Sequence, residues 1–149
     1  MKHLNIALAV VALWLNVATA AEPIWTTDAL KAVAKAKAEK KLVLLNFTGS
    51  DWCPWCIKLK QEVFSTPAFA AYAQTNLVLV EVDFPRHKQL PPAQKSYNHA
   101  LQKKFEIEGY PTIIVLNGEG AKIGKLGYHA GGPAPFIAKL EKLKSKAEK

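Results

Sequence analysis

The sequence predicts an α/β fold in which a central mixed β-sheet carries helices on both faces. Short, almost continuous apolar runs at 42–47, 77–83 and 112–116 are typical of strands buried on both faces of a sheet. Segments with helical spacing separate these runs, which favours parallel pairing early in the chain. The Asn-Gly-Glu-Gly sequence at 117–120 predicts a tight hairpin, so the strand expected at 121–128 runs antiparallel to its predecessor.

The helices follow from capping residues and apolar periodicity. Thr26 or Thr27 is expected to cap a first helix at 29–40, in which Ala, Val and Lys alternate at helical spacing. A second helix is expected to begin near Cys53, with Pro54 in its first turn, where proline is best tolerated. Further helical segments are expected at 67–72, 93–105 and 135–146, and a polar, proline-rich loop at 85–92.

The first 20 residues have the pattern of a secretory signal peptide. A short polar start precedes an apolar stretch at 4–17, and the small residues Ala18, Thr19 and Ala20 suit cleavage by signal peptidase. An uncleaved anchor is the alternative, although the stretch is shorter than the roughly 20 residues that a membrane span needs. We therefore expect residues 21–149 to form one exported domain without a second membrane-spanning segment.

The composition is that of an ordinary globular protein with an excess of basic residues. The formal net charge is +8, but the lysines lie mostly in the segments 31–41 and 139–149, where their spacing fits solvated helix faces. An exported protein rarely meets nucleic acid, so the basic charge does not indicate nucleic-acid binding.

The two cysteines, Cys53 and Cys56, carry the clearest functional signal. A disulfide that closes so short a loop adds little stability, so a chemical purpose is favoured over an inert structural bridge. A zinc site would need two further ligands, and His87, His99 and His129 are scattered over different predicted elements, so no metal is expected. The favoured chemistry is therefore thiol–disulfide exchange.

Cys53 is expected to be the attacking thiolate and Cys56 the resolving thiol. The first turn of a helix presents unpaired N–H groups and the positive end of the helix dipole, and both stabilise a thiolate. Cys56 lies one turn further along the same side, so it is expected to be more buried and to resolve the mixed disulfide of Cys53. Trp52 precedes the pair and Trp55 lies between its two cysteines, and both are expected to offer an apolar platform to an extended substrate segment.

Two residues outside the cysteine motif are candidates for supporting roles. Glu81 lies between apolar residues of a predicted strand, where a carboxylate can take the proton of Cys56; a salt-bridged glutamate is the alternative. Pro111 follows Tyr110 directly before a buried strand, and the X-Pro bond there can be cis or trans. Asp51 is expected to be exposed.

The segment Asn-Phe-Thr-Gly-Ser-Asp-Trp-Cys-Pro-Trp-Cys at 46–56 resembles the active-site segment of the thioredoxin superfamily. Gly-Tyr-Pro-Thr at 109–112 is similar to the cis-proline loop of that family. The resemblance covers residues 25–143 and implies a thioredoxin fold, a redox-active cysteine pair and a cis Pro111 beside it.

Within the superfamily, the chain resembles small periplasmic Dsb-type thiol reductases, the DsbH-like group. The similarity is carried by the segments 47–53 and 80–85, Val-Glu-Val-Asp-Phe-Pro in the second case. It implies a reductase of disulfides in exported proteins that receives electrons from a DsbD-type membrane donor. We expect a monomer without a cofactor. An oxidase, an isomerase and a peptide-binding module without turnover remain alternatives. We expect the substrate-binding surface to comprise Trp52, Pro54, Trp55 and Tyr110.

The chain departs from thioredoxin itself at two places. Pro54 and Trp55 replace the Gly-Pro dipeptide, and since this dipeptide tunes the reduction potential, the motif alone leaves the direction of electron flow open. Asn46 aligns with a buried aspartate of thioredoxin, and an amide cannot accept a proton as a carboxylate does. Glu81 is therefore the better candidate for a base.

Overall fold

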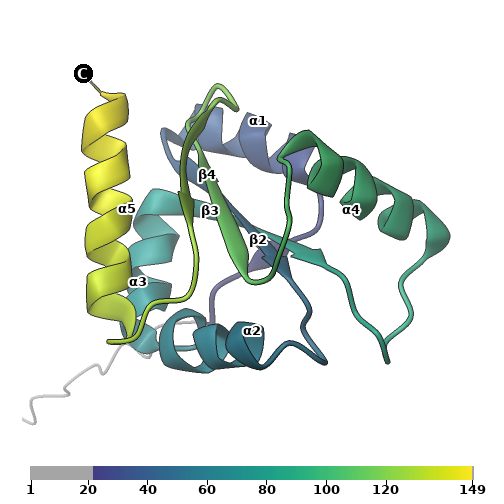
Figure 1. The fold of residues 1–149 in the computed structure, drawn as a ribbon. Helices are drawn as coiled ribbons and strands as arrows, with labels where there is room; N and C mark the ends of the chain where they lie inside the picture. Colours follow the sequence, from purple (N-terminus) through teal and green to yellow (C-terminus); the bar gives the residue numbers. More distant parts are fainter. Residues whose placement is uncertain (1–21, 149) are drawn as a thin grey trace, which may run out of the picture.

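The computed structural model describes residues 22–148, which form a five-stranded sheet flanked by helices (Figure 1). The strand order is β1-β3-β2-β4-β5, with β4 antiparallel to β2, β5 antiparallel to β4 and the other pairs parallel. The strands are β1 (Trp25–Thr26), β2 (Leu42–Thr48), β3 (Leu77–Asp83), β4 (Thr112–Leu116) and β5 (Lys122–Leu126). The predicted signal peptide at 1–20 lies outside the described residues. Within 22–148, no helix has the length and apolar character that a membrane crossing requires.

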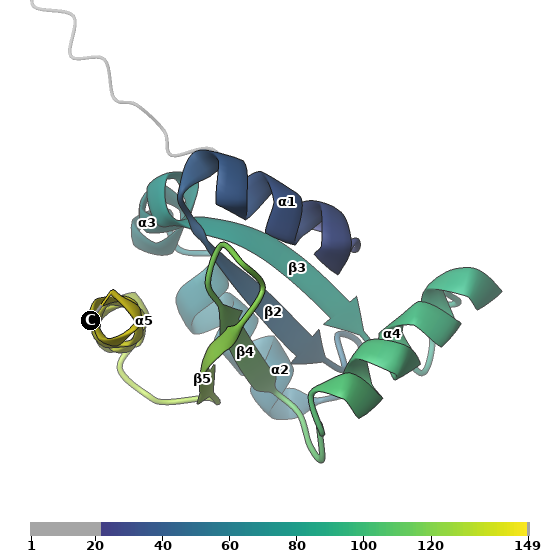
Figure 2. The same ribbon diagram turned by 90° about the horizontal axis from the view of Figure 1, so that it is seen from above.

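Helices cover both faces of the sheet, as the sequence predicted, and Figure 2 shows α4 and α5 on opposite sides of it. The helix that starts at the cysteine pair ends early and continues directly into a π-helical turn, labelled η1, which the sequence pattern did not indicate. The helical elements are α1 (Ala29–Glu39), α2 (Pro54–Leu59), η1 (Lys60–Phe64), α3 (Pro67–Asn76), α4 (Pro92–Lys104) and α5 (Pro133–Ala147).

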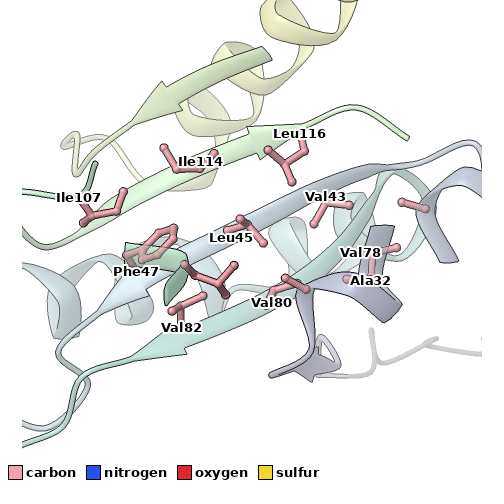
Figure 3. Packing of buried hydrophobic residues seen from close by; sticks show 13 residues of the cluster. Ala32, Val43, Leu45, Phe47, Val78, Val80, Val82, Ile107, Ile114 and Leu116 are labelled. Carbon is pink, nitrogen blue, oxygen red and sulfur yellow. The ribbon is translucent and has the colours of Figure 1, made fainter. Parts of the chain in front are cut away.

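Each central strand buries both of its faces, because neighbouring residues of a strand point to opposite sides. In β2, Val43, Leu45 and Phe47 join a core cluster with residues of α1 and α4 (Figure 3). Leu44 belongs to the opposite cluster, which includes residues of α2, η1, α3 and α5. The same alternation places Asn46 on the α2 side of the sheet, so a polar residue lies beneath the helix that carries the cysteines.

The entrance to α1 differs from the prediction. Trp25 and Thr26 form the short strand β1, in which Trp25 is aligned with Leu79 of β3. The N-cap of α1 is Asp28 rather than a threonine, and its side chain accepts the backbone N–H of Lys31 at 3.0 Å. A strand of two residues shows no apolar alternation, so its sequence reads equally well as the start of a helix.

The hairpin between β4 and β5 agrees with the prediction. The side-chain oxygen of Asn117 accepts the backbone N–H groups of Glu119 and Ala121, which closes the turn. Gly120 has a φ of +81°, a conformation that residues with a side chain rarely adopt. Asparagine and glycine, the residue types from which the hairpin was predicted, therefore both form part of the turn.

Candidate active site

The cysteine pair lies at the start of α2, as predicted. Cys53 is the N-cap residue with an extended backbone (φ −87°, ψ 109°), and Pro54 follows in the first turn. The Sγ of Cys53 accepts the backbone N–H of Cys56 at 3.3 Å. A thiolate at Cys53 therefore has a backbone donor and the positive end of a helix beside it, and both favour the anion.

Cys53 and Cys56 form a disulfide, with their Cα atoms 5.2 Å apart. Both residues are 4% exposed, so the prediction that Cys56 is the more buried of the two is wrong for the oxidised protein. The bridge holds the two sulfurs side by side, and both residues are equally buried. The two sulfurs differ instead in their contacts: the backbone N–H of Gly49 is directed at the Sγ of Cys56, at 3.5 Å.

The turn between β2 and α2 is attached to the end of β3. Ser50 donates its backbone N–H to Oδ1 of Asp83 at 2.9 Å and its hydroxyl to Oδ2 at 2.5 Å. Asp83 is 4% exposed, and the Nζ of Lys88 lies 3.6 Å from its carboxylate. These contacts fix the turn that leads into Cys53.

Asp51 fastens a second segment to the same turn. Its carboxylate accepts the backbone N–H groups of Arg86, His87 and Lys88 at 2.8–2.9 Å. These hydrogen bonds, with that of Arg86 the strongest influence, lower the pKa of Asp51 to about 2. The sequence predicted only an exposed residue here, whereas Asp51 is half-buried and clamps the loop between β3 and α4 against the active site.

Trp52, in the turn before Cys53, contacts two other loops: the loop after β3 and the segment before β4. Its Nε1 donates to the carbonyl oxygen of Phe84 at 2.7 Å, and the guanidinium of Arg86 lies 3.7 Å from the ring centroid. The Tyr110 ring meets the indole edge to face, with a centroid distance of 6.0 Å. A Cβ at Gly49 would lie 2.5 Å from the indole, so the close approach of Trp52 requires glycine at that position.

Trp55 provides the open aromatic surface of the site. It is 54% exposed, and its ring lies 5.1 Å from that of Tyr128. The Nζ of Lys58 is 5.5 Å from both ring centroids. The two aromatic rings therefore form a surface that is apolar but carries a cation at its edge.

The Tyr110–Pro111 peptide bond is cis. Thr112, the next residue, is aligned with Phe47 near the end of β2, so this segment lies at the sheet edge from which the active-site turn leaves. Tyr110 is half-buried, and its hydroxyl accepts a hydrogen bond from the side-chain amide of Gln102 at 2.8 Å. Burial raises the pKa of Tyr110.

A small cavity with both polar and apolar lining residues lies beside Cys56, on the α2 side of the sheet. Its volume is about 150 Å³, and its lining includes Asn46, Cys56, Lys60 and Glu81. Glu81 is half-buried, and burial is the main reason why its pKa is raised. The negative charge of Asp83 raises the pKa further, while the positive charges of Lys88 and Lys60 oppose the shift.

The three histidines that the zinc alternative would have needed, His87, His99 and His129, are all exposed. Across residues 22–148, no three histidine, cysteine, aspartate or glutamate side chains gather in a way that could hold a metal ion.

The clamp formed by Asp51 and the link between Ser50 and Asp83 are the features that sequence reasoning missed. An aspartate shortly before a helix is a common partner for backbone N–H groups, so the residue type was a usable signal. Its partners, however, lie 35–37 residues further along the chain, and no local pattern identifies them.

These features define the class of the protein. A cysteine pair at the start of a helix, on a mixed sheet and beside a cis-proline segment, is the arrangement of thioredoxin-like proteins. A family model described as "Thioredoxin-like domain" matches residues 30–144, and the chain belongs to this family.

Relatives with known names place the chain more narrowly. It is 34% identical over 111 residues to the disulfide bond reductase DsbH of Chlamydia pneumoniae, covering 74% of this chain and 67% of that protein. The solved structure of a DsbH oxidoreductase superposes with a TM-score of 0.80 at 30% identity, covering 95% of this chain and 94% of the other. The thiol:disulfide interchange protein DsbD 2 of Pseudomonas aeruginosa is 29% identical over 60% of this chain but only 14% of its own length. The chain is a protein-disulfide oxidoreductase with a disulfide-forming pair, Cys53 and Cys56.

Proposed function

We propose that this protein acts in the periplasm as a reductase of disulfides in exported proteins. The observation that carries the proposal is its similarity to a disulfide bond reductase over two thirds of that relative's length. The signal-peptide pattern at 1–20 supports export across the inner membrane.

In the proposed reaction, the Cys53 thiolate attacks one sulfur of a client disulfide and displaces the other client sulfur as a thiolate. The helix N-terminus and the N–H of Cys56 stabilise the attacking thiolate. Cys56 then attacks the Cys53 sulfur of the mixed disulfide, which releases the second client thiolate and closes the disulfide. Glu81, in the cavity beside Cys56, takes the proton that the Cys56 thiol must lose.

The client segment is proposed to lie across the exposed face of α2. Pro54 and Trp55 are both exposed, Tyr110 and Pro111 are partly exposed, and the Tyr110 ring contacts Trp52, the residue before Cys53. Trp52 was predicted to be part of the apolar platform, and its contacts support a second role. Its indole N–H donates to the carbonyl oxygen of Phe84, and the Arg86 guanidinium lies over its ring. Its proposed role is to hold the client-binding loops in place.

The proposed electron donor is a membrane protein of the DsbD type. The similarity to a segment of DsbD 2 supports this choice only indirectly, because it covers a small part of that protein. The donor would reduce the Cys53–Cys56 disulfide by the same exchange chemistry in reverse. We propose that the protein works as a monomer without a bound cofactor.

The deciding experiment is the equilibrium reduction potential of the Cys53–Cys56 pair in thiol buffers of defined composition. Reducing thioredoxin-like proteins lie near about −270 mV, whereas a strong oxidase lies near about −120 mV. The Cys53→Ser variant is the control, because it removes the couple itself. A value near the reducing end, together with reduction of insulin disulfides by the wild type, supports the proposal.

A value near the oxidising end would overturn the proposed direction and reassign the protein as a disulfide-forming oxidase. The donor is tested separately in cells. In a host that lacks its DsbD-type protein, alkylation should find the cysteine pair oxidised, whereas it should be reduced in the parent strain. A reduced pair in both strains excludes that donor.

A further inference from the structure

Asn46 carries a buried hydrogen-bond acceptor that lacks a protein partner. The residue is 7% exposed, and its Oδ1 has no donor within hydrogen-bond distance among the described residues. Leaving a buried polar atom unpaired costs free energy, so such atoms normally have a partner in at least one working state of the protein. The side chain lines the cavity beside Cys56, so the groups that line this cavity are the candidates for a partner.

Thr48, Ser50, Lys60 and Ser65 also line the cavity, but Glu81 is the lining group that is aligned with Asn46 in the sheet and becomes a donor on protonation. Asn46 and Glu81 are aligned on the neighbouring parallel strands β2 and β3, so their side chains leave the same face of the sheet as neighbours. An ionised carboxylate only accepts hydrogen bonds, whereas a protonated one donates through its O–H. A protonated Glu81 therefore has the O–H donor that the Asn46 oxygen lacks.

The charges around the cavity are compatible with a proton on Glu81. Burial and the negative charge of Asp83 on the same strand both raise the pKa of Glu81. Lys60 from η1 and Lys88 from the loop after β3 act in the opposite direction. Glu22, near the start of the described chain, is an exposed carboxylate that also lines the cavity.

We infer that Asn46 is a positioning residue that binds the protonated form of Glu81 and so helps Glu81 to take the proton of Cys56. The inference rests on the proposed role of Glu81 and adds a function for the amide. A cavity of about 150 Å³ also has room for water, at about 30 Å³ per molecule, so the proton can pass through a water between the thiol and the carboxylate.

The step balances as follows. The S–H bond of Cys56 breaks, its electron pair stays on sulfur, and the proton forms an O–H bond on Glu81. The Cys56 sulfur attacks the Cys53 sulfur, while the bond from Cys53 to the client breaks and its electron pair leaves with the client thiolate. The two cysteines are oxidised to a disulfide, the client disulfide is reduced, and Asn46 accepts the new O–H of Glu81.

The test measures the resolution step alone. Full-length reduced protein is mixed with saturating oxidised glutathione, so that attack of Cys56 on the Cys53–glutathione disulfide limits the rate. Acid-quenched samples are followed by intact-mass spectrometry over a range of pH. The proteins are the wild type, Asn46→Leu, Asn46→Asp, Glu81→Gln and the Asn46→Leu/Glu81→Gln double variant.

Asn46→Leu should slow resolution about threefold to tenfold, the worth of one hydrogen bond, and should move the midpoint of the pH profile to lower pH. Asn46→Asp places a second carboxylate beside Glu81, so the midpoint should move to higher pH. In the Glu81→Gln background, Asn46→Leu should have no further effect, because its route of action is gone.

Equal slowing by both Asn46 variants with unmoved midpoints would overturn the inference, since a purely structural residue behaves in that way. Additive effects of Asn46→Leu and Glu81→Gln would also overturn it while leaving Glu81 as the base. An unchanged rate in Glu81→Gln alone would remove Glu81 from the mechanism and the inference with it. The reduction potential, measured separately, decides the direction of electron flow and leaves this test unaffected.

Discussion

Replacing Ser50 with alanine should destabilise the protein through one hydrogen bond beside the active site. The Ser50 hydroxyl donates to the buried carboxylate of Asp83 at 2.5 Å, and the backbone N–H of Ser50 keeps its own bond to the other oxygen. A hydrogen bond to a charged group contributes about 1.5–3 kcal/mol. Lys88 remains near the carboxylate after the substitution, so we expect a loss of about 2 kcal/mol.

Urea unfolding of the oxidised protein measures this loss. With a slope of about 2 kcal/mol per molar urea, the unfolding midpoint should fall by about 1 M. Ser96→Ala is the matched control, because Ser96 is exposed on α4 and makes no side-chain hydrogen bond among the described residues. A midpoint shift below about 0.2 M for Ser50→Ala, within the error of such measurements, would refute the assigned strength of the contact.

Three further predictions follow from other parts of the structure. Asp51→Ala removes the acceptor of three backbone N–H groups, so hydrogen exchange in the 84–91 loop should accelerate. In the wild type the pKa of Asp51 is about 2, so the loop should loosen only as the pH falls towards that value. The raised pKa of Glu81 means that its contribution to stability is fully present below the pKa of unfolded glutamate and is lost as the pH rises through the folded pKa. Glu81→Gln should therefore show a flatter dependence of the urea midpoint on pH than the wild type, measured from about pH 4 to about pH 9. Phe136→Ala, in a fully buried position of α5, should lower the free energy of unfolding by about 3–5 kcal/mol in urea titrations.

Each of these has an outcome that contradicts it. Unchanged exchange in the 84–91 loop of Asp51→Ala would show that other contacts hold the loop. Parallel pH profiles for Glu81→Gln and the wild type would show that the carboxyl ionises alike in the folded and unfolded chain. A loss below about 1 kcal/mol for Phe136→Ala would show that the core relaxes around the missing ring.

Local sequence was sufficient wherever short-range chemistry decides the structure. The apolar runs of β2, β3 and β4 identified buried strands because a strand covered on both faces has no polar side to show. The start of α2 followed from Pro54 next to Cys53, since both residue types suit a first turn. The redox pair was recognisable because two cysteines three positions apart can meet within one helical turn.

The tertiary structure decided what lies around the pair. Glu81 was predicted from the sequence as a candidate base. That it lies beside Asn46 depends on the register between β2 and β3, which is set by residues far apart in the chain. The partners of Asp51 and Trp52 lie 32–37 residues away, in a loop without a regular pattern. By itself the sequence determined that the chain folds around a mixed sheet and exchanges disulfides, because periodicity and motif spacing are local. Only tertiary packing decided which carboxylate, amide and aromatic ring lie around the sulfurs. Those contacts join segments that are far apart in the chain, and no local sequence pattern predicts such contacts.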